Sequence, residues 1–190
     1  MLTLRALDEA QLPDLYERHM RRDFPESELK PLKQVLRLFR RGVYDVLGAY
    51  DGDELAAYAL VYRRAGGVAP LLDYFAVEPS RRGHGAGSEA LALLRGHYGR
   101  QWQALLIECE RPDATPDRAG AEARIRFYEH AGARCTNLRA RLFGVEFRIL
   151  CLPCTDAATA FDCEAELRAL YLDMLTPEVF ARCGALGREA

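Results

Sequence analysis

Residues 75–91, FAVEPSRRGHGAGSEAL, join an apolar run to a helix-forming sequence through a loop that contains three glycines. Gly83, Gly85 and Gly87 alternate with other residues, and the pattern that follows predicts a helix from about Ser88. Glycine gives up side-chain packing and loses more backbone entropy on folding than any other residue. Three glycines in so short a loop therefore indicate a ligand that must come close to the main chain.

A phosphate or pyrophosphate group would suit this loop. A helix that begins near Ser88 directs unpaired N–H groups and the positive end of its dipole back at the loop. Glycines let an anion reach those N–H groups, and Arg81 and Arg82 add positive charge. The plain alternative is a glycine-rich turn that binds nothing.

Two common phosphate-binding patterns fit poorly. A P-loop requires a lysine after its last glycine, and this loop has no lysine. Residues 85–90, GAGSEA, match the dinucleotide fingerprint G-x-G-x-x-A, with Glu108 as the acidic residue near the end of the next strand. However, residues 78–84 separate the apolar strand from the first glycine, where that fingerprint has a tight turn, and hairpins precede the strand. A dinucleotide-binding oxidoreductase is therefore the weakest reading.

A third pattern fits every fixed position. Residues 82–87, RGHGAG, resemble the [RQ]-x-x-G-x-[GA] acyl-CoA loop of the GNAT superfamily of N-acetyltransferases, and the preceding FAVEP resembles that family's strand end. Residues 123–132, ARIRFYEHAG, resemble its penultimate helix, which carries a Tyr-Glu pair and then a glycine. One predicted helix and one predicted strand separate the two blocks, as in the family. The resemblance extends more weakly from residue 1 to about residue 152.

The resemblance implies an α/β fold with a central mixed, mostly antiparallel sheet, in which strands 4 and 5 splay apart and helices cover both faces. The predicted order is a strand, two helices, three strands, a helix, a strand, a helix, two strands and a helical tail, which differs from a doubly wound sheet. We expect the acetyltransferase domain at 1–154 and a helical extension at 155–190. Its apolar stripe should pack on the same domain or on a partner subunit; the stripe consists of Leu167, Leu170, Tyr171 and Met174.

At the site, the resemblance implies binding of acetyl-CoA and direct transfer of its acetyl group to an amine. The main chain of Phe75, Ala76 and Val77 would hold the pantetheine arm and the acetyl carbonyl, and one N–H there would stabilise the oxyanion. The pyrophosphate would lie on the loop, whose expected binding residues are Arg82, Gly83, His84, Gly85, Ala86, Gly87 and Ser88.

The attacking amine must lose a proton, because a free alkyl amine has a pKa of about 10. Asp73, within the strand LLDYFAV, and Glu108, on the adjacent strand, are the two candidate general bases. Their structural alternatives are a solvated strand-end carboxylate and a buried ion pair. Tyr128 matches the family's helix tyrosine, which serves as the acid for the CoA thiolate; its alternative is packing beside Phe127.

The family usually builds its acceptor site from the first two helices and the loop between them. Glu26 and Glu28 in that loop could receive a cationic amine, or they could be solvated charges. The acceptor class is a small molecule or a peptide, and its identity stays open. The same fold can also serve as a non-catalytic acyl-CoA-binding regulatory module, so this alternative is kept. The chain could be a monomer or a homodimer.

Composition excludes several other classes. The net charge of −2 gives no reason to expect a nucleic-acid partner, and no apolar stretch reaches the length of a membrane span. The start of the sequence lacks the pattern of a signal peptide, so we expect a cytoplasmic protein with reduced cysteines. Cys151 and Cys154 have the spacing of a redox or zinc pair, but no second pair completes a zinc site. We therefore expect no metal and a structural role for both thiols.

Overall fold

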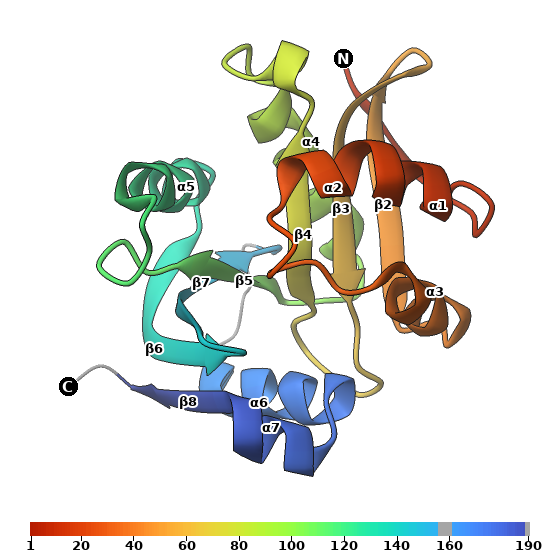
Figure 1. Cartoon of the computed structure of the whole chain (residues 1–190). Helices are drawn as coiled ribbons and strands as arrows, with labels where there is room; N and C mark the ends of the chain where they lie inside the picture. The colour runs from red at the N-terminus through yellow and green to blue at the C-terminus, as the bar shows by residue number, and fades with distance from the viewer. Residues whose placement is uncertain (156–160, 189–190) are drawn as a thin grey trace. The chain divides into compact units, whose positions relative to one another are not determined.

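The computed structural model describes residues 1–155 and 161–188, which form two compact units (Figure 1). The first unit comprises Met1–Ala65 and Asp73–Leu93, and the second comprises Gly66–Leu72 and Leu94–Ala190. The chain passes between the units within one strand and within one helix. The two units are therefore interleaved along the sequence.

The first unit is built on antiparallel strands in the order β1-β2-β3-β4. Their bounds are β1 Thr3–Ala6, β2 Tyr44–Asp51, β3 Glu54–Tyr62 and β4 Leu71–Val77. Asp51 pairs with Glu54 across a turn of two residues, Gly52 and Asp53, which confirms that a hairpin precedes β4; Asp-Gly is a sequence typical of such turns. The strand predicted at LLDYFAV is confirmed as β4, whose first two residues belong to the second unit.

The first predicted helix of this unit consists of three consecutive helical segments, α1 Leu12–Leu15, the π-helical turn η1 Tyr16–Met20 and α2 Arg21–Asp23. Pro13 lies in the first turn, where its missing N–H has no helical partner to lose. The second predicted helix is α3 Leu32–Arg40, which buries Val35 and Leu38. A short 3-10 turn, η2 Pro79–Arg81, follows β4 and leads into the glycine loop.

The second unit has strand order β4-β5-β7-β6-β8. The strands are β5 Ala104–Glu110, β6 Arg134–Leu142, β7 Val145–Pro153 and β8 Gly184–Arg188. The start of β4 pairs with β5 in parallel, with Leu71 opposite Leu106, whereas β5–β7, β7–β6 and β6–β8 are antiparallel. The strands thus make the mixed, mostly antiparallel sheet that was predicted. The helices are α5 Arg118–His130, α6 Cys163–Met174 and α7 Pro177–Cys183, and α4 Ala86–Tyr98 runs through both units.

The C-terminal extension contains more than the predicted helical tail. Leu167, Leu170 and Tyr171 on α6 are fully buried within the single chain, so the apolar stripe needs no partner subunit to cover it. The helical part of the extension was expected to end at about Cys183, and α7 ends there; Gly184–Arg188 then forms β8, a strand that was not predicted, by antiparallel pairing with β6. Its sequence GALGR lacks the alternation of apolar and polar residues that predicts a strand. The segment is a strand because its backbone pairs with the edge of β6. Residues 156–160, where the tail helix was expected to begin, lie outside the described residues.

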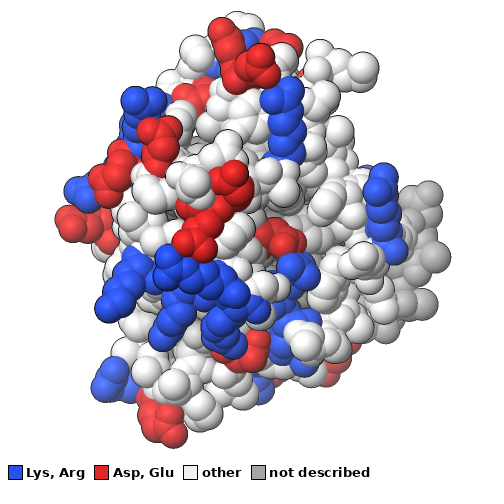
Figure 2. All heavy atoms as spheres, turned by 90° about the vertical axis from the view of Figure 1, so that its right-hand side faces the viewer, with Lys and Arg blue, Asp and Glu red and all other residues white. Residues whose placement is uncertain are grey.

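Charge is mixed on the surface. On the face shown in Figure 2, basic side chains gather in one area, while acidic side chains lie beside them and elsewhere. Among the described residues, no helix combines the length and the apolar composition that crossing a membrane requires. Within 1–155 and 161–188, no group of three or more His, Cys, Asp or Glu side chains is arranged to hold a metal ion.

Candidate active site

The glycine loop presents bare main chain at the start of a helix. Gly83 and Gly85 have φ angles of 74° and 84°, a conformation that favours glycine. A Cβ at either position would meet no atom within 4 Å, so the space beside both residues is open. Helix α4 begins at Ala86, two residues before the predicted start, and the Glu89 N–H donates to the Gly85 carbonyl at 3.0 Å. Gly87 and Ser88 therefore lie in the first helical turn, where N–H groups lack intrahelical partners.

An apolar cluster fixes both ends of the loop within the first unit. Phe75 and Val77 at the end of β4 and Ala86 at the start of α4 pack against buried small residues, including Ala57 and Ala90. Because the two flanking elements share one cluster, the loop is held at a fixed span. The main chain of residues 75–77 and the helix start therefore form one rigid platform.

The two arginines before the glycines brace the loop instead of projecting as free charges. Arg81 donates to Asp51 at 3.0 Å and to Glu54 at 2.6 Å, and the bond to Glu54 raises the arginine pKa. Arg82 donates through Nε to the Val77 carbonyl and through Nη2 to Asp23, each at 2.9 Å. Both arginines carry positive charge at the loop, as expected, and carboxylates of the first unit pair with it. An anion here would be held chiefly by main-chain N–H groups and the helix dipole.

The open space at the glycines and the helix start fit the pyrophosphate of a CoA molecule. His84, the loop residue between the two glycines, is exposed, and its Nδ1 lies 2.7 Å from the Arg82 carbonyl. The imidazole thus holds the loop on its own main chain. None of the seven predicted loop residues blocks the bare backbone with a buried side chain.

Asp73 is the centre of an ionic cluster in the first unit. Lys30 Nζ donates to its two carboxylate oxygens at 2.8 and 2.7 Å, and the Tyr44 hydroxyl donates to Oδ2. The side chains of Asp73 and Lys30 are 7% and 19% exposed. Burial and the Asp73 charge raise the pKa of Tyr44 well above its ordinary value, so the hydroxyl keeps its proton. Asp73 is therefore a buried, ion-paired carboxylate and not the solvated strand-end group of the structural alternative.

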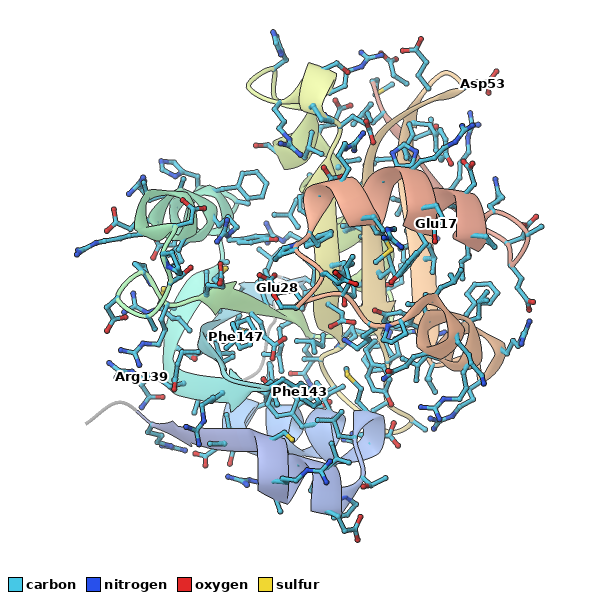
Figure 3. All side chains as sticks on the ribbon, in the orientation of Figure 1. Glu17, Glu28, Asp53, Arg139, Phe143 and Phe147 are labelled. Atoms are coloured by element: carbon cyan, nitrogen blue, oxygen red, sulfur yellow. The ribbon has the colours of Figure 1, made fainter. Side chains whose placement is uncertain are left out.

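The predicted acceptor loop is attached to the same strand as Asp73. The Tyr74 hydroxyl donates to the Glu28 carbonyl at 2.7 Å and accepts from the Lys30 N–H at 2.9 Å. The rings of Phe24 and Tyr74 are in edge contact with centroids 4.9 Å apart. Glu26 is exposed on the segment between α2 and α3. Glu28, on the same segment, is half-buried (Figure 3). Three contacts to β4 thus fix the backbone that carries both glutamates.

A second ionic cluster ties the N-terminal helix to the end of β4. Glu78 Oε1 lies 2.5 Å from His19 Nδ1 and accepts from Arg22 Nη2 at 2.9 Å. Arg22 also donates to Asp23, whose side chain is 3% exposed. Burial raises the pKa of Glu78, but the hydrogen bonds with Arg22 and His19 outweigh burial and hold the pKa below its ordinary value. The first unit thus holds its helix, loop and strand together through paired opposite charges.

The second unit holds Glu108 in a different way. Glu108 lies on β5 opposite Ile149 of β7, and its side chain is partly exposed. The Tyr171 hydroxyl, from α6, donates to Glu108 Oε1. One contact that holds this carboxylate therefore comes from a neutral hydroxyl of the C-terminal extension. The buried ion pair with an arginine, which was the structural alternative for Glu108, is not the contact that the structure identifies at Oε1.

Tyr128 is buried on α5, with its ring in edge contact with Phe127 at a centroid distance of 5.1 Å. Burial and the neighbouring Cys109 raise its pKa above the ordinary tyrosine value, although Arg124 opposes this shift. Burial likewise raises the pKa of the Cys109 thiol to about 12. Tyr128 therefore keeps its proton at neutral pH, as a general acid must.

The cysteine pair suggested by sequence spacing is not the pair that the fold brings together. The Cys151 thiol hydrogen-bonds with Cys163 at the start of α6, and this contact raises the pKa of Cys151. Cys154 is buried beside them, and burial raises its pKa to about 11. All three are free thiols.

Sequence reasoning missed the partners of both candidate bases. Lys30 and Tyr44 were not predicted to meet Asp73, although Lys30 is one of only two lysines in the chain. Tyr171 was assigned to the apolar stripe alone. A hydroxyl on an otherwise buried stripe is itself a signal, because a buried tyrosine usually needs a hydrogen-bond partner. The sequence gives no indication that this partner is Glu108.

The chain belongs to the GNAT family of acetyltransferases: the model of the Acetyltransferase (GNAT) family matches residues 4–133. At the level of the family, the chain is an N-acetyltransferase, and acetyl-CoA is the cosubstrate that the family uses. The match covers the glycine loop, β4, β5 and α5 and stops before the C-terminal extension. A search of curated proteins found no significant match.

Solved structures of GNAT proteins share the fold. A protein of this family from Bacteroides thetaiotaomicron aligns with a TM-score of 0.69 and 18% identity, covering 93% of this chain and 98% of its own. The ribosomal-protein-S18-alanine N-acetyltransferase of Escherichia coli gives 0.59 and 21%, covering 86% and 98%. Spermidine N-acetyltransferase of Vibrio cholerae, solved with CoA and spermine, gives 0.60 and 10%, covering 80% and 95%. At these identities the likeness confirms the predicted fold.

Proposed function

We propose that this chain transfers an acetyl group from acetyl-CoA directly to a primary amine of a small molecule or peptide. The observation that carries the proposal is the open glycine loop at the start of α4, in which a Cβ at Gly83 or Gly85 would meet no protein atom. When bound, acetyl-CoA supplies an activated acetyl thioester. The loop N–H groups would hold its pyrophosphate, and the main chain of residues 75–77 would hold its pantetheine arm.

Glu108 is the general base in this proposal. The Asp73 side chain is 7% exposed, and Lys30 Nζ donates to its two carboxylate oxygens at 2.8 and 2.7 Å. Glu108 is partly exposed and accepts from the Tyr171 hydroxyl at Oε1, so a substrate amine, or a water bound to it, has better access to Glu108. Asp73 instead holds the acceptor loop against β4. Tyr128, whose pKa is raised by burial, donates a proton to the departing thiolate.

The acceptor enters beside the loop that carries Glu26 and Glu28. Two of the similar structures are named as N-acetyltransferases of ribosomal-protein-S18 alanine and of spermidine, and spermidine carries primary amines. A carboxylate near the entry would favour the cationic form of such a substrate. The base must then remove a proton before attack, because very little of an alkyl amine is neutral at pH 7.

Isothermal calorimetry with acetyl-CoA tests the binding half of the proposal. Gly85→Glu should abolish binding, because the new carboxylate would occupy the space of the pyrophosphate and repel it. Gly42→Glu is the matched control: Gly42 lies in the same unit with a φ of 69° and no atom within 4 Å of its Cβ position. The control should suffer the same backbone strain and still bind acetyl-CoA.

Mass spectrometry of acetyl-CoA reactions with spermidine, an N-terminal-alanine peptide and a lysine peptide tests the transfer half. Acetylation of at least one amine supports the proposal. A chain that binds acetyl-CoA but acetylates none of them would be a regulatory acyl-CoA-binding module. A chain that binds NADH tightly and ignores acetyl-CoA would restore the dinucleotide reading.

A further inference from the structure

The C-terminal extension supplies a polar contact to the proposed site. Tyr171 is fully buried on α6, and its hydroxyl donates to Glu108 Oε1 on β5. The two residues are 63 positions apart in the sequence. Tyr171 lies beyond residue 133, where the family match ends, so this contact belongs to the extension of this chain.

The position of Tyr171 is fixed by packing along α6. Leu167 and Leu170 are fully buried on the same helix, and the ring of Phe180 on α7 lies 5.6 Å from the Tyr171 ring, centroid to centroid. Asp162 caps the start of α6, accepting from the Glu164 and Ala165 N–H groups at 3.0 and 3.1 Å. This packing restricts the Tyr171 ring and therefore the position of its hydroxyl.

A buried glutamate attaches the same helix to the loop before β4. Glu166 is 7% exposed, and its Oε1 accepts from the Val68 N–H at 3.0 Å. Val68 and Glu166 lie in the second unit together with β5. Helix α6 is therefore bound to its unit by a main-chain contact five residues before Tyr171, in addition to the apolar stripe.

We propose that Tyr171 is a positioning residue that orients the Glu108 carboxylate to receive the proton of the acceptor amine. The hydroxyl donates to Oε1 and so restricts rotation of the carboxylate about its terminal bond, which is otherwise a soft torsion. Donation to a carboxylate also stabilises its charged form, which is the form that a general base needs. The inference rests on the proposed transferase function and on Glu108 as its base.

The extension would thereby couple catalysis to the docking of α6. A GNAT core that ends near β7 would hold Glu108 without this hydroxyl. In this chain Glu108 receives the hydrogen bond from Tyr171 only when α6, residues 163–174, is folded within the second unit.

Tyr171→Phe removes the hydroxyl and keeps the ring. We expect the acid limb of the pH profile of kcat/KM to move to higher pH by about one unit, because the carboxylate loses a charge-stabilising hydrogen bond. The profile is measured with acetyl-CoA and whichever of spermidine, the alanine peptide or the lysine peptide the wild type acetylates fastest. The KM for acetyl-CoA should stay within a few-fold, because the glycine loop is unchanged.

Tyr98→Phe is the matched control. Tyr98 is a buried tyrosine at the end of α4 in the same unit, 2% exposed, and outside the proposed site. Its variant also loses a buried hydroxyl but should leave the acid limb in place. Cys109 and Glu110 follow Glu108 on β5, Arg148 of β7 lies opposite Cys109, and these ionisable groups are the same in all variants.

Carbon-13 NMR of glutamate-labelled protein follows the carboxylate itself, without an acceptor. The Glu108 signal is the one missing in Glu108→Gln, and its titration midpoint should rise in Tyr171→Phe and not in Tyr98→Phe. An unchanged titration midpoint of Glu108 in Tyr171→Phe would overturn the inference. A midpoint that moves while the acid limb of the kcat/KM profile stays in place would also overturn it. In both cases the transferase function would stand. A wild type that acetylates no amine would instead remove the proposed function.

A second variant covers the case in which Tyr171→Phe fails to fold. Incorporation of 3-fluorotyrosine at position 171 keeps the shape of the ring and makes the hydroxyl a stronger donor. The acid limb should then move to lower pH, opposite to the phenylalanine variant. A limb that does not move, or moves upward, would contradict the assigned role.

Discussion

Asp73 in the first unit and Glu108 in the second are both carboxylates on buried strands, and they differ in exposure. The Asp73 side chain is 7% exposed, Lys30 Nζ donates to its two oxygens, and the Tyr44 hydroxyl donates to Oδ2. Glu108 is partly exposed, and the Tyr171 hydroxyl donates to its Oε1. A base must reach the substrate amine directly or through one water, and the more exposed carboxylate offers that access. Strand position alone therefore does not decide which carboxylate is a base.

Ion pairs occur in both units, and in the second Arg124 pairs with Glu110 of β5 at 2.6 Å. The first unit joins its helix, loop and strand by ion pairs, among them Arg82 with Asp23 and Arg22 with Glu78. Around β5, the second unit places two neutral tyrosine hydroxyls, those of Tyr128 and Tyr171, on helices α5 and α6. We infer that the ion pairs hold the binding platform in shape and that the hydroxyls serve proton transfer.

The largest expected effect is on Glu108. Glu108→Gln is nearly isosteric and removes the base, so kcat/KM should fall by about 10²–10⁴-fold at neutral pH. Activity should recover as the pH rises toward the pKa of the amine, because neutral amine then forms without a base. Steady-state kinetics between pH 6 and about 10 measure both changes. A variant with wild-type kcat/KM and an unchanged pH profile would show that Glu108 is not the general base, and the distinction drawn between Glu108 and Asp73 would fail.

Asp73→Asn should act on stability instead. The substitution removes the carboxylate of a buried ion pair with Lys30, and the free energy of unfolding should fall by about 3 kcal/mol. Urea denaturation measures this loss, and kcat per folded molecule should stay within a few-fold. Asp53→Asn is the control: its pair with Arg5 is fully exposed at the aspartate, so little stability should change. A large loss of kcat in stable Asp73→Asn would transfer the role of base to Asp73.

Tyr128→Phe removes the hydroxyl of the proposed general acid and so tests the role of a tyrosine in the second unit. The thiolate of CoA has a pKa near that of cysteine, about 8.5, and leaves partly unaided at neutral pH. The loss in kcat should therefore lie near the lower end of the general-acid range, about 10²-fold. Calorimetry should show acetyl-CoA affinity within a few-fold of wild type. Full retention of kcat would remove Tyr128 from the mechanism.

The smallest expected effect concerns pH and Glu78. Because the folded-state pKa of Glu78 is lowered, its contribution to stability is present above the unfolded pKa of about 4.3 and is lost as the pH falls through the folded value. Relative to wild type, Glu78→Gln should be less stable by about 1 kcal/mol at neutral pH, and the gap should close in acid. Thermal denaturation between about pH 3 and 7 tests this, and a gap independent of pH would show that the ion pairs contribute nothing.

Much of the fold could be predicted because local patterns and tertiary structure agree. The Asp-Gly turn, the apolar strands β4 and β5 and the glycine loop each carry a local signal, and each is confirmed. Strand β8 could not be predicted, because Gly184–Arg188 is a strand only through pairing with β6. The roles of the candidate site residues remain predictions. Their environments depend on contacts such as that of Tyr171 with Glu108. These contacts join segments that are distant in the sequence, so no local sequence pattern predicts them.

The late position of β8 in the sequence has a consequence for synthesis of the chain. Gly184 pairs with Leu142. After Leu142 has been synthesised, 42 further residues (184 minus 142) must be added before the first residue of β8 is available to pair with that edge of β6. At about 5–20 residues per second, this open edge lasts about 2–8 s on a translating ribosome. An unpaired strand edge is a template for the wrong partner during that interval. Changes that slow the docking of β8 should therefore reduce the yield of native protein even where the finished molecule is equally stable.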